Sequence, residues 1–207
     1  QVESLWSRLI ELGAQPAGLG ARDSLRLEAG LPLYGNELGL DPGGMEIPVF
    51  ALSQARFAVS FHPDKGEFIG RAALQEQFND LQKVLERDFK GVGRLKQIIR
   101  PIALVGKGIA RHGDKVFIND KQVGWITSGT VAPYWKTTGE GLESRMVDET
   151  GKRPVCLGLI DSTLLIGQEL DIDVRGKRIK AVVVAHHLRS EPPRARAIIR
   201  EEDGSGQ

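Results

Sequence analysis

The chain of 207 residues has few of the side chains that most often carry catalysis or bind metals. It contains one cysteine, Cys156, and four histidines. A single cysteine excludes an intrachain disulfide and any cysteine-based zinc site, and it fits a reducing compartment, so we expect a cytoplasmic protein. No histidine is spaced with Asp, Glu or Cys as metal ligands are, and the adjacent His186 and His187 would point to opposite faces of a strand. The sequence therefore predicts no metal site.

The chain also has no marked excess of positive or negative charge and no long apolar run. The 28 basic and 27 acidic residues leave a net charge of +1, so no long-range field attracts nucleic acid or an acidic membrane. No apolar run approaches the roughly 20 residues that span a bilayer, and no signal peptide is recognisable. We expect no nucleic acid and no membrane as partners. The chain begins with Gln1 directly in a helical pattern, as we expect of a fragment.

Familiar nucleophile and phosphate motifs are missing as well. Ser128 lacks the surroundings of a nucleophile elbow, and we expect it at a strand end. Cys156 lies in an apolar run, which predicts an inert core thiol. The sequence Gly106-Lys107-Gly108 lacks the spacing of a P-loop. Serine and cysteine catalysis and nucleotide hydrolysis are therefore disfavoured.

The first 93 residues show helical periodicity. With 41% hydrophobic and 27% charged residues, the composition is that of a globular protein. Apolar residues at steps of three and four predict helices. These are a core-facing helix over 2–12, a short helix capped by Asp23 or Ser24 and ending at Glu28, and a long helix over 69–90. The apolar segment 47–61 is compatible with strand or helix.

After residue 94 the helical pattern gives way to β-branched runs separated by glycine and charged turns. Strands are predicted at 97–104, 115–118, 122–130, 155–161, 169–174 and 178–185, with hairpin turns at 119–121 and 175–177. Residues 136–152 have little apolar content and are predicted to form a long loop. The fold class is therefore α+β, with a small antiparallel barrel or sandwich in the second half.

The segment from Gly18 to Glu37 concentrates arginines, carboxylates, a phenol and glycines. Arginine presents a rigid fork of donors that matches a planar polar heterocycle or a carboxylate. Arg22 and Arg26 share a face if the segment is helical, whereas Glu28 points elsewhere. Two interpretations stay open: a surface helix with ordinary ion pairs, or closely packed backbone around an arginine that requires a partner.

Four segments of the chain resemble one protein family in the expected order. They read LGARDSLRLEAGLPLYGNE at 19–37, FIGR at 68–71, VGWITSGT at 123–130 and GQELDIDVRGK at 167–177. The first closely resembles the motif of the glycine cleavage T-proteins, the tetrahydrofolate-dependent aminomethyltransferases. Because the resemblance extends to about residue 185, the chain is identified as a C-terminal portion of such a protein.

The resemblance implies a fold and a division into domains. Family members are three-domain cloverleaves with folate at the centre and an antiparallel barrel as the last domain. Residues 1–93 then form the C-terminal part of the folate-binding region, 94–189 form the barrel, and 190–207 form a tail or linker. This tail could join a fused downstream module.

The resemblance also implies an activity. The family transfers the aminomethyl group from the dihydrolipoyl arm of lipoylated H-protein to tetrahydrofolate and releases ammonia. Arg22 matches the family's folate-binding arginine. The catalytic aspartate and a Gly-Tyr-Thr-Gly-Glu motif belong to the N-terminal part of the family and are absent here. No catalytic residue is therefore assigned, and the chain alone is expected to be inactive.

Two other functions are compatible with the same residues. A folate-dependent demethylase of the same fold would share Arg22 and the barrel but use another one-carbon donor. A non-catalytic folate-binding sensor or assembly protein would release no ammonia even with the N-terminal half restored. The C-terminal sequence after residue 185 departs from the usual family ending, so no folate contact is assigned there.

Overall fold

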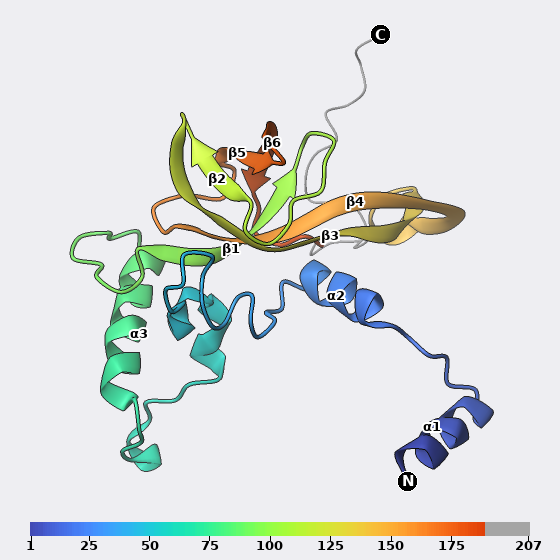
Figure 1. Cartoon of the computed structure of the whole chain (residues 1–207), viewed down its shortest axis with the longest axis horizontal. Coiled ribbons are helices and arrows are strands. Elements are labelled where there is room, and N and C mark those ends of the chain that lie inside the picture. The colour runs from blue at the N-terminus through green and yellow to red at the C-terminus, as the bar shows by residue number, and fades with distance from the viewer. Residues whose placement is uncertain (189–207) are drawn as a thin grey trace.

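The second half of the chain is a closed antiparallel barrel in the computed structural model, which describes residues 1–188 (Figure 1). Its six strands follow each other around the barrel in the order β1-β4-β3-β2-β5-β6. Their bounds are β1 Gln97–Leu104, β2 Lys115–Ile118, β3 Lys121–Thr138, β4 Arg145–Asp161, β5 Glu169–Val174 and β6 Lys177–Val183. The predicted α+β fold with an antiparallel barrel is confirmed, and a sandwich is not formed. The tail predicted at 190–207 lies outside the described residues.

Two tight hairpins connect neighbouring strands where the sequence predicts them. Asn119 and Asp120 both have positive φ, 47° and 63°, and so do Arg175 and Gly176, 54° and 80°. Two consecutive residues of positive φ are typical of the turn whose twist matches that of the flanking strands. The local turn chemistry therefore sets the β2–β3 and β5–β6 registers.

The helical segments lie outside the barrel, and the first of them stands clear of it. They are α1 Val2–Glu11, α2 Leu19–Glu28 and α3 Arg71–Leu85, with short 3-10 turns at Val49–Ala51, Ser53–Phe57, Pro63–Lys65 and Gly141–Glu143. One core fills the barrel around Ile102, Ile126 and Ile172. A second core joins Leu27 and Phe50 to the outer face of the sheet. The sequence did not decide between strand and helix for the segment 47–61. In the structure it forms 3-10 turns that contribute to this second core.

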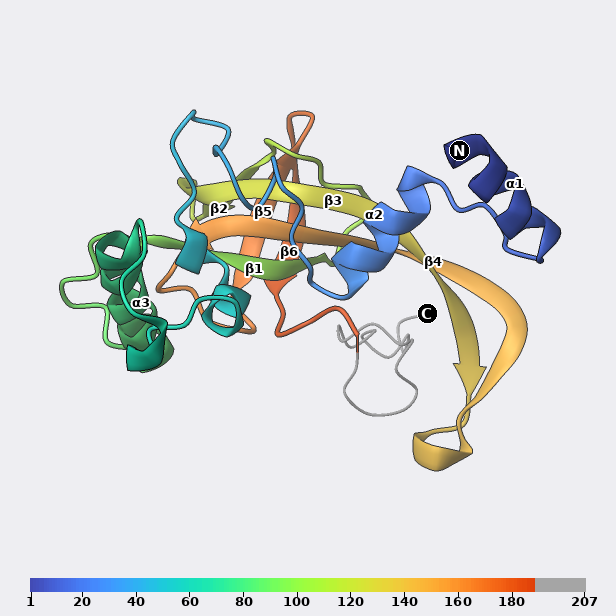
Figure 2. The ribbon, with the colours of Figure 1, turned by 90° about the horizontal axis from the view of Figure 1, so that it is seen from below.

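The prediction of a long loop at 136–152 is wrong. Strands β3 and β4 stay paired as far as Thr138 and Arg145 and project beyond the barrel as an arm (Figure 2). Lys136 and Glu149 form a cross-strand ion pair of 2.8 Å on this arm. Because the barrel already aligns the two strands, the arm needs cross-strand pairs rather than a buried apolar face.

The predicted position of the first helix is confirmed, but its predicted burial is wrong. None of the residues of α1 is buried. The second helix also differs, because α2 begins at Leu19 after Gly18, so that Asp23 and Ser24 lie within the helix and cap nothing. Within residues 1–188, no helix has the length and apolar character needed to cross a membrane.

The end of the described chain is fixed by a buried histidine. His187 is 4% exposed, and its ring Nε2 lies 2.9 Å from the backbone carbonyl of Cys156, which accepts the hydrogen bond. Burial lowers the pKa of His187 to about 4, and the cationic Arg153 and His186 contribute in the same direction. Burial also raises the pKa of the Cys156 thiol far above its ordinary value, which confirms an inert core thiol.

We expect the stability of the chain to fall on acidification through His187. The unfolded chain takes up a proton near the ordinary histidine pKa of about 6.5, whereas the folded chain does so only near pH 4. Between these values the free energy of unfolding should fall by up to about 3 kcal/mol. Urea titrations from pH 7 to pH 4 should show a smaller fall in His187→Leu. An equal fall in His187→Leu and the wild type contradicts the expectation, and His62→Gln, at an exposed histidine, serves as the control.

Candidate functional site

Helix α2 lies across strands β3 and β4 and carries both arginines of the 19–37 segment (Figures 1 and 2). It ends at Glu28 and is followed by Gly30, whose φ of 69° suits a glycine that terminates a helix. The Leu31 N–H then bonds back to the Arg26 carbonyl at 2.8 Å. This sharp end returns the chain towards the barrel, so that Glu37 approaches the helix again.

Arg26 is the buried arginine of α2, with 8% of its surface exposed. Its Nη1 donates to Glu37 Oε2 at 2.8 Å, its Nη2 to Ser128 Oγ at 2.8 Å and its Nε to Asp23 Oδ1 at 2.8 Å. Glu37 is completely buried and also accepts the Leu33 N–H at 2.9 Å. A buried charge pair is tolerated when hydrogen bonds satisfy its remaining donors and acceptors, as they do here.

A β-bulge in β3 brings the barrel's hydroxyl groups to this pair. The register between β3 and β4 shifts by one residue at Thr127, and a bulge of this kind redirects side chains relative to a regular strand. Thr127 Oγ1 donates to Glu37 Oε1 at 2.7 Å, while Ser128 Oγ accepts from Arg26. The expectation of Ser128 at a strand end is therefore wrong, because Ser128 lies within β3 at an irregularity that the local sequence did not reveal.

The same bulge ties two loops to the barrel. Asn36 Nδ2 and His112 Nδ1 both donate to the Thr127 carbonyl, at 3.1 Å and 2.8 Å. Arg111 Nη1 donates to the Gly129 carbonyl at 2.9 Å. At Gly129 a Cβ would overlap the Ala110 backbone carbonyl, so glycine is required for the loop to cross here. The 19–37 and 123–130 segments thus meet in one buried polar network.

A second ion pair holds the last residue of α2. Glu28 Oε1 and Arg153 Nη2 are 2.7 Å apart, and their side chains are 15% and 8% exposed. The Arg153 guanidinium also lies 5.6 Å from the centre of the Tyr134 ring. Helix α2 is therefore anchored to β3 through Arg26 and to β4 through Glu28.

Arg22 lies outside this network. It is exposed, and its side chain forms no hydrogen bond or ion pair with another residue within 1–188. Its neighbours three residues along the helix on either side, Leu19 and Leu25, are 82% and 66% exposed. Arg22 and Arg26 lie one helical turn apart on the same side of α2, as the spacing predicts, but only Arg26 is buried. The assignment of Arg22 to folate stays a prediction.

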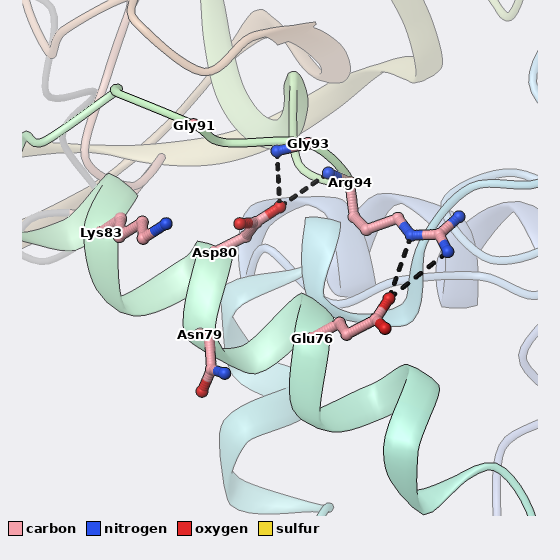
Figure 3. Close-up of a pocket in the computed structure, with 7 residues that line it drawn as sticks. All are labelled: Glu76, Asn79, Asp80, Lys83, Gly91, Gly93 and Arg94. Atoms are coloured by element: carbon pink, nitrogen blue, oxygen red, sulfur yellow. Dashed lines mark hydrogen bonds and ion pairs between the residues drawn. The ribbon is translucent and has the colours of Figure 1, made fainter.

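A hollow of about 490 Å³ lies beside α3, away from the 19–37 segment (Figure 3). Its lining consists of Glu76, Asn79, Asp80, Lys83, Gly91, Gly93 and Arg94. Asp80 Oδ2 accepts the backbone N–H groups of Gly93 at 2.9 Å and Arg94 at 2.6 Å. Because these bonds occupy the buried carboxylate, Asp80 anchors the loop after α3 and is not a free base. Among the described residues, no cluster of three His, Cys, Asp or Glu could hold a metal ion.

The chain is similar to bacterial aminomethyltransferases. It is 37% identical over 186 residues to that of Caldanaerobacter subterraneus subsp. tengcongensis, an alignment that covers 87% of this chain and 40% of the relative. Against the Rubrobacter xylanophilus aminomethyltransferase it is 44% identical over 133 residues, which cover 64% of this chain and 30% of the relative. No protein-family model matches the chain.

A solved structure shares the fold. The glycine cleavage system aminomethyltransferase T from Bartonella henselae superposes with a TM-score of 0.59 at 25% identity, over 88% of this chain and 42% of that one. The barrel and its attached helices are therefore the architecture of part of a one-carbon-group transferase. The chain belongs to the aminomethyltransferase, or glycine cleavage T-protein, family, and it spans less than half the length of these relatives.

We expect the two arginines of α2 to differ in their effect on stability. Arg26→Met should lower the free energy of unfolding by about 3 to 5 kcal/mol, because it leaves the Glu37 carboxylate buried without its charged partner. Arg22→Met should change it by less than about 0.5 kcal/mol, since the side chain is exposed. Urea denaturation of both variants at neutral pH measures the difference. Equal losses in the two variants would show that the buried pair is not what holds α2.

Proposed function

We propose that the chain is part of an aminomethyltransferase that moves a one-carbon unit from the aminomethyl-dihydrolipoyl group of lipoylated H-protein to tetrahydrofolate and releases ammonia. The observation that carries the proposal is the match to aminomethyltransferases at 34% to 37% identity over 87% to 89% of the chain. The shared T-protein fold supports it. A cytoplasmic location is part of the same proposal.

Arg22 is proposed to bind the folate. Its guanidinium is exposed and takes part in no polar contact among residues 1–188, while the C-terminal end of α2 is fixed by Arg26 and Glu28. The exposed Leu19 and Leu25 flank it. A charged fork between apolar side chains suits a ligand that combines flat rings with carboxylates. Tetrahydrofolate, when bound, supplies the amine that receives the one-carbon unit.

The carboxylates that the structure buries do not suit the catalytic role. Glu37 is occupied by Arg26 and Thr127, and Asp80 is occupied by backbone N–H groups. We therefore propose that the catalytic carboxylate belongs to the part of the family fold that this chain does not match. The chain by itself should then bind folate weakly and catalyse nothing.

Activity assays of the chain alone, and of the chain fused to the unmatched part of a relative, test the proposal. We expect no ammonia release from aminomethyl-loaded H-protein and tetrahydrofolate with the chain alone. A fusion of the chain to the unmatched part of the Caldanaerobacter aminomethyltransferase should release ammonia. Release by the isolated chain contradicts the assignment of the catalytic carboxylate. A fusion that binds folate and releases no ammonia contradicts the proposed reaction and favours a demethylase or a non-catalytic folate-binding protein.

Arg22→Ala in the same fusion should weaken tetrahydrofolate binding by about 1 to 3 kcal/mol, the contribution of a charged hydrogen bond. Isothermal titration calorimetry measures the affinity. Arg145→Ala, which removes an exposed arginine from the distant β3–β4 arm, is the matched control and should leave the affinity unchanged. If Arg22→Ala also binds with wild-type affinity, Arg22 does not contact the folate.

A further inference from the structure

The hollow beside α3 contains two opposite charges that lie close together without pairing. Lys83 follows Asp80 by three residues, and both side chains line the hollow. Opposite charges at this spacing are neighbours on a helix and commonly form an ion pair. In Figure 3 the Lys83 side chain and the Asp80 carboxylate point towards one another. Among residues 1–188, however, no ion pair joins them, and the Lys83 ammonium takes part in no hydrogen bond.

The Asp80 carboxylate has one oxygen that is used and one that is not. The side chain is 7% exposed, and Oδ2 accepts the backbone N–H groups of Gly93, Arg94 and Leu95 at 2.9, 2.6 and 3.3 Å. Oδ1 accepts no hydrogen bond from the described residues. Because the loop fixes the carboxylate and buried polar atoms are ordinarily hydrogen-bonded, this second oxygen is a preoriented acceptor that indicates a ligand in the hollow.

The loop after α3 closes one end of the hollow beside the lysine. Gly91 has a φ of 68°, a conformation that suits glycine, and a Cβ built there would lie 3.9 Å from Lys83 Nζ. Glu76 and Arg94 form the other end through an ion pair of 3.4 Å, with side chains that are 61% and 66% exposed. An exposed pair of this kind contributes little to stability, so both charges stay available to a ligand.

The lining matches a small zwitterion better than a simple ion. Two of the charged side chains are acidic and two are basic, and none of the lining side chains is apolar. Lys83 and Asp80 are separated along the helix axis by about 4.5 Å, the rise of three residues. The carboxylate and ammonium groups of an α-amino acid are similarly close. The volume of about 490 Å³ leaves room for a polar side chain that extends towards Glu76.

We propose that the hollow beside α3 binds a small α-amino acid with a polar side chain. Lys83 donates a hydrogen bond to its carboxylate, and Asp80 Oδ1 accepts one from its ammonium group. Both bonds are charge-assisted and are therefore stronger than neutral ones. The hollow lies away from the 19–37 segment, so the inference does not rest on the proposed function.

A titration of the whole chain with L-glutamine, followed by amide chemical shifts, tests the site. We expect the Gly91 and Gly93 amides to shift. The Kd should be lower by about tenfold or more than that of acetate or methylamine, each of which carries one of the two charges.

Two substitutions locate the binding. Lys83→Met should raise the Kd for L-glutamine by about tenfold or more, because it removes a charged donor. Lys90→Met removes an exposed lysine of the same loop that does not line the hollow, and it should leave the Kd unchanged. Asp80→Asn keeps an oxygen that can accept from the loop but lacks the charge, and it should also weaken binding.

Several results overturn the proposal. L-Glutamine that leaves the Gly91 and Gly93 amides unshifted shows that no amino acid binds here. Acetate or methylamine that binds as tightly as L-glutamine makes the hollow a site for a simple ion. Wild-type affinity in Lys83→Met shows that L-glutamine is held elsewhere. Equal thermal unfolding of Lys83→Met and Lys90→Met shows that both stay folded, so these two variants decide the matter even if Asp80→Asn loosens the loop.

Discussion

The attachment of helix α2 to the barrel depends on one buried ion pair, between Arg26 and Glu37. Neither group can be left alone in the interior without a large free-energy cost, so helix α2 and the loop that follows it must stay together. Thr127 also donates a hydrogen bond to the Glu37 carboxylate, and the Arg26 guanidinium donates one to the Ser128 hydroxyl. Both hydroxyls come from one β-bulge. The interaction therefore fixes the 19–37 segment to the barrel and not merely to itself.

This attachment gives the two arginines of α2 different tasks. Arg26 forms a buried ion pair with Glu37, and Glu28 holds the end of the helix by its ion pair with Arg153. With the C-terminal end of α2 anchored at these two positions, Arg22 is exposed one helical turn before Arg26. The same helix thus connects the structural core with the surface at which we propose that folate binds.

The sequence predicted what local chemistry determines. The strands at 97–104, 115–118 and 169–174 and the hairpins at 119–121 and 175–177 follow from alternation and turn residues. The polar network could not be predicted, because Arg26 and Ser128 are 102 residues apart and a bulge leaves no local pattern. The resemblance identified both segments but not their contact. The arm at 136–152 was missed because its strands are aligned by the barrel, and the burial of α1 was overestimated because periodicity identifies an apolar face but not what covers it.

A double-mutant cycle between Arg26 and Glu37 tests most directly whether this pair holds the 19–37 segment to the barrel. The free energies of unfolding of Arg26→Met, Glu37→Met and the double variant are compared with that of the wild type. We predict a coupling energy of at least about 2 kcal/mol, because the double variant removes both buried charges together. A coupling energy near zero would contradict the account, since it would mean that the two side chains stabilise the fold independently.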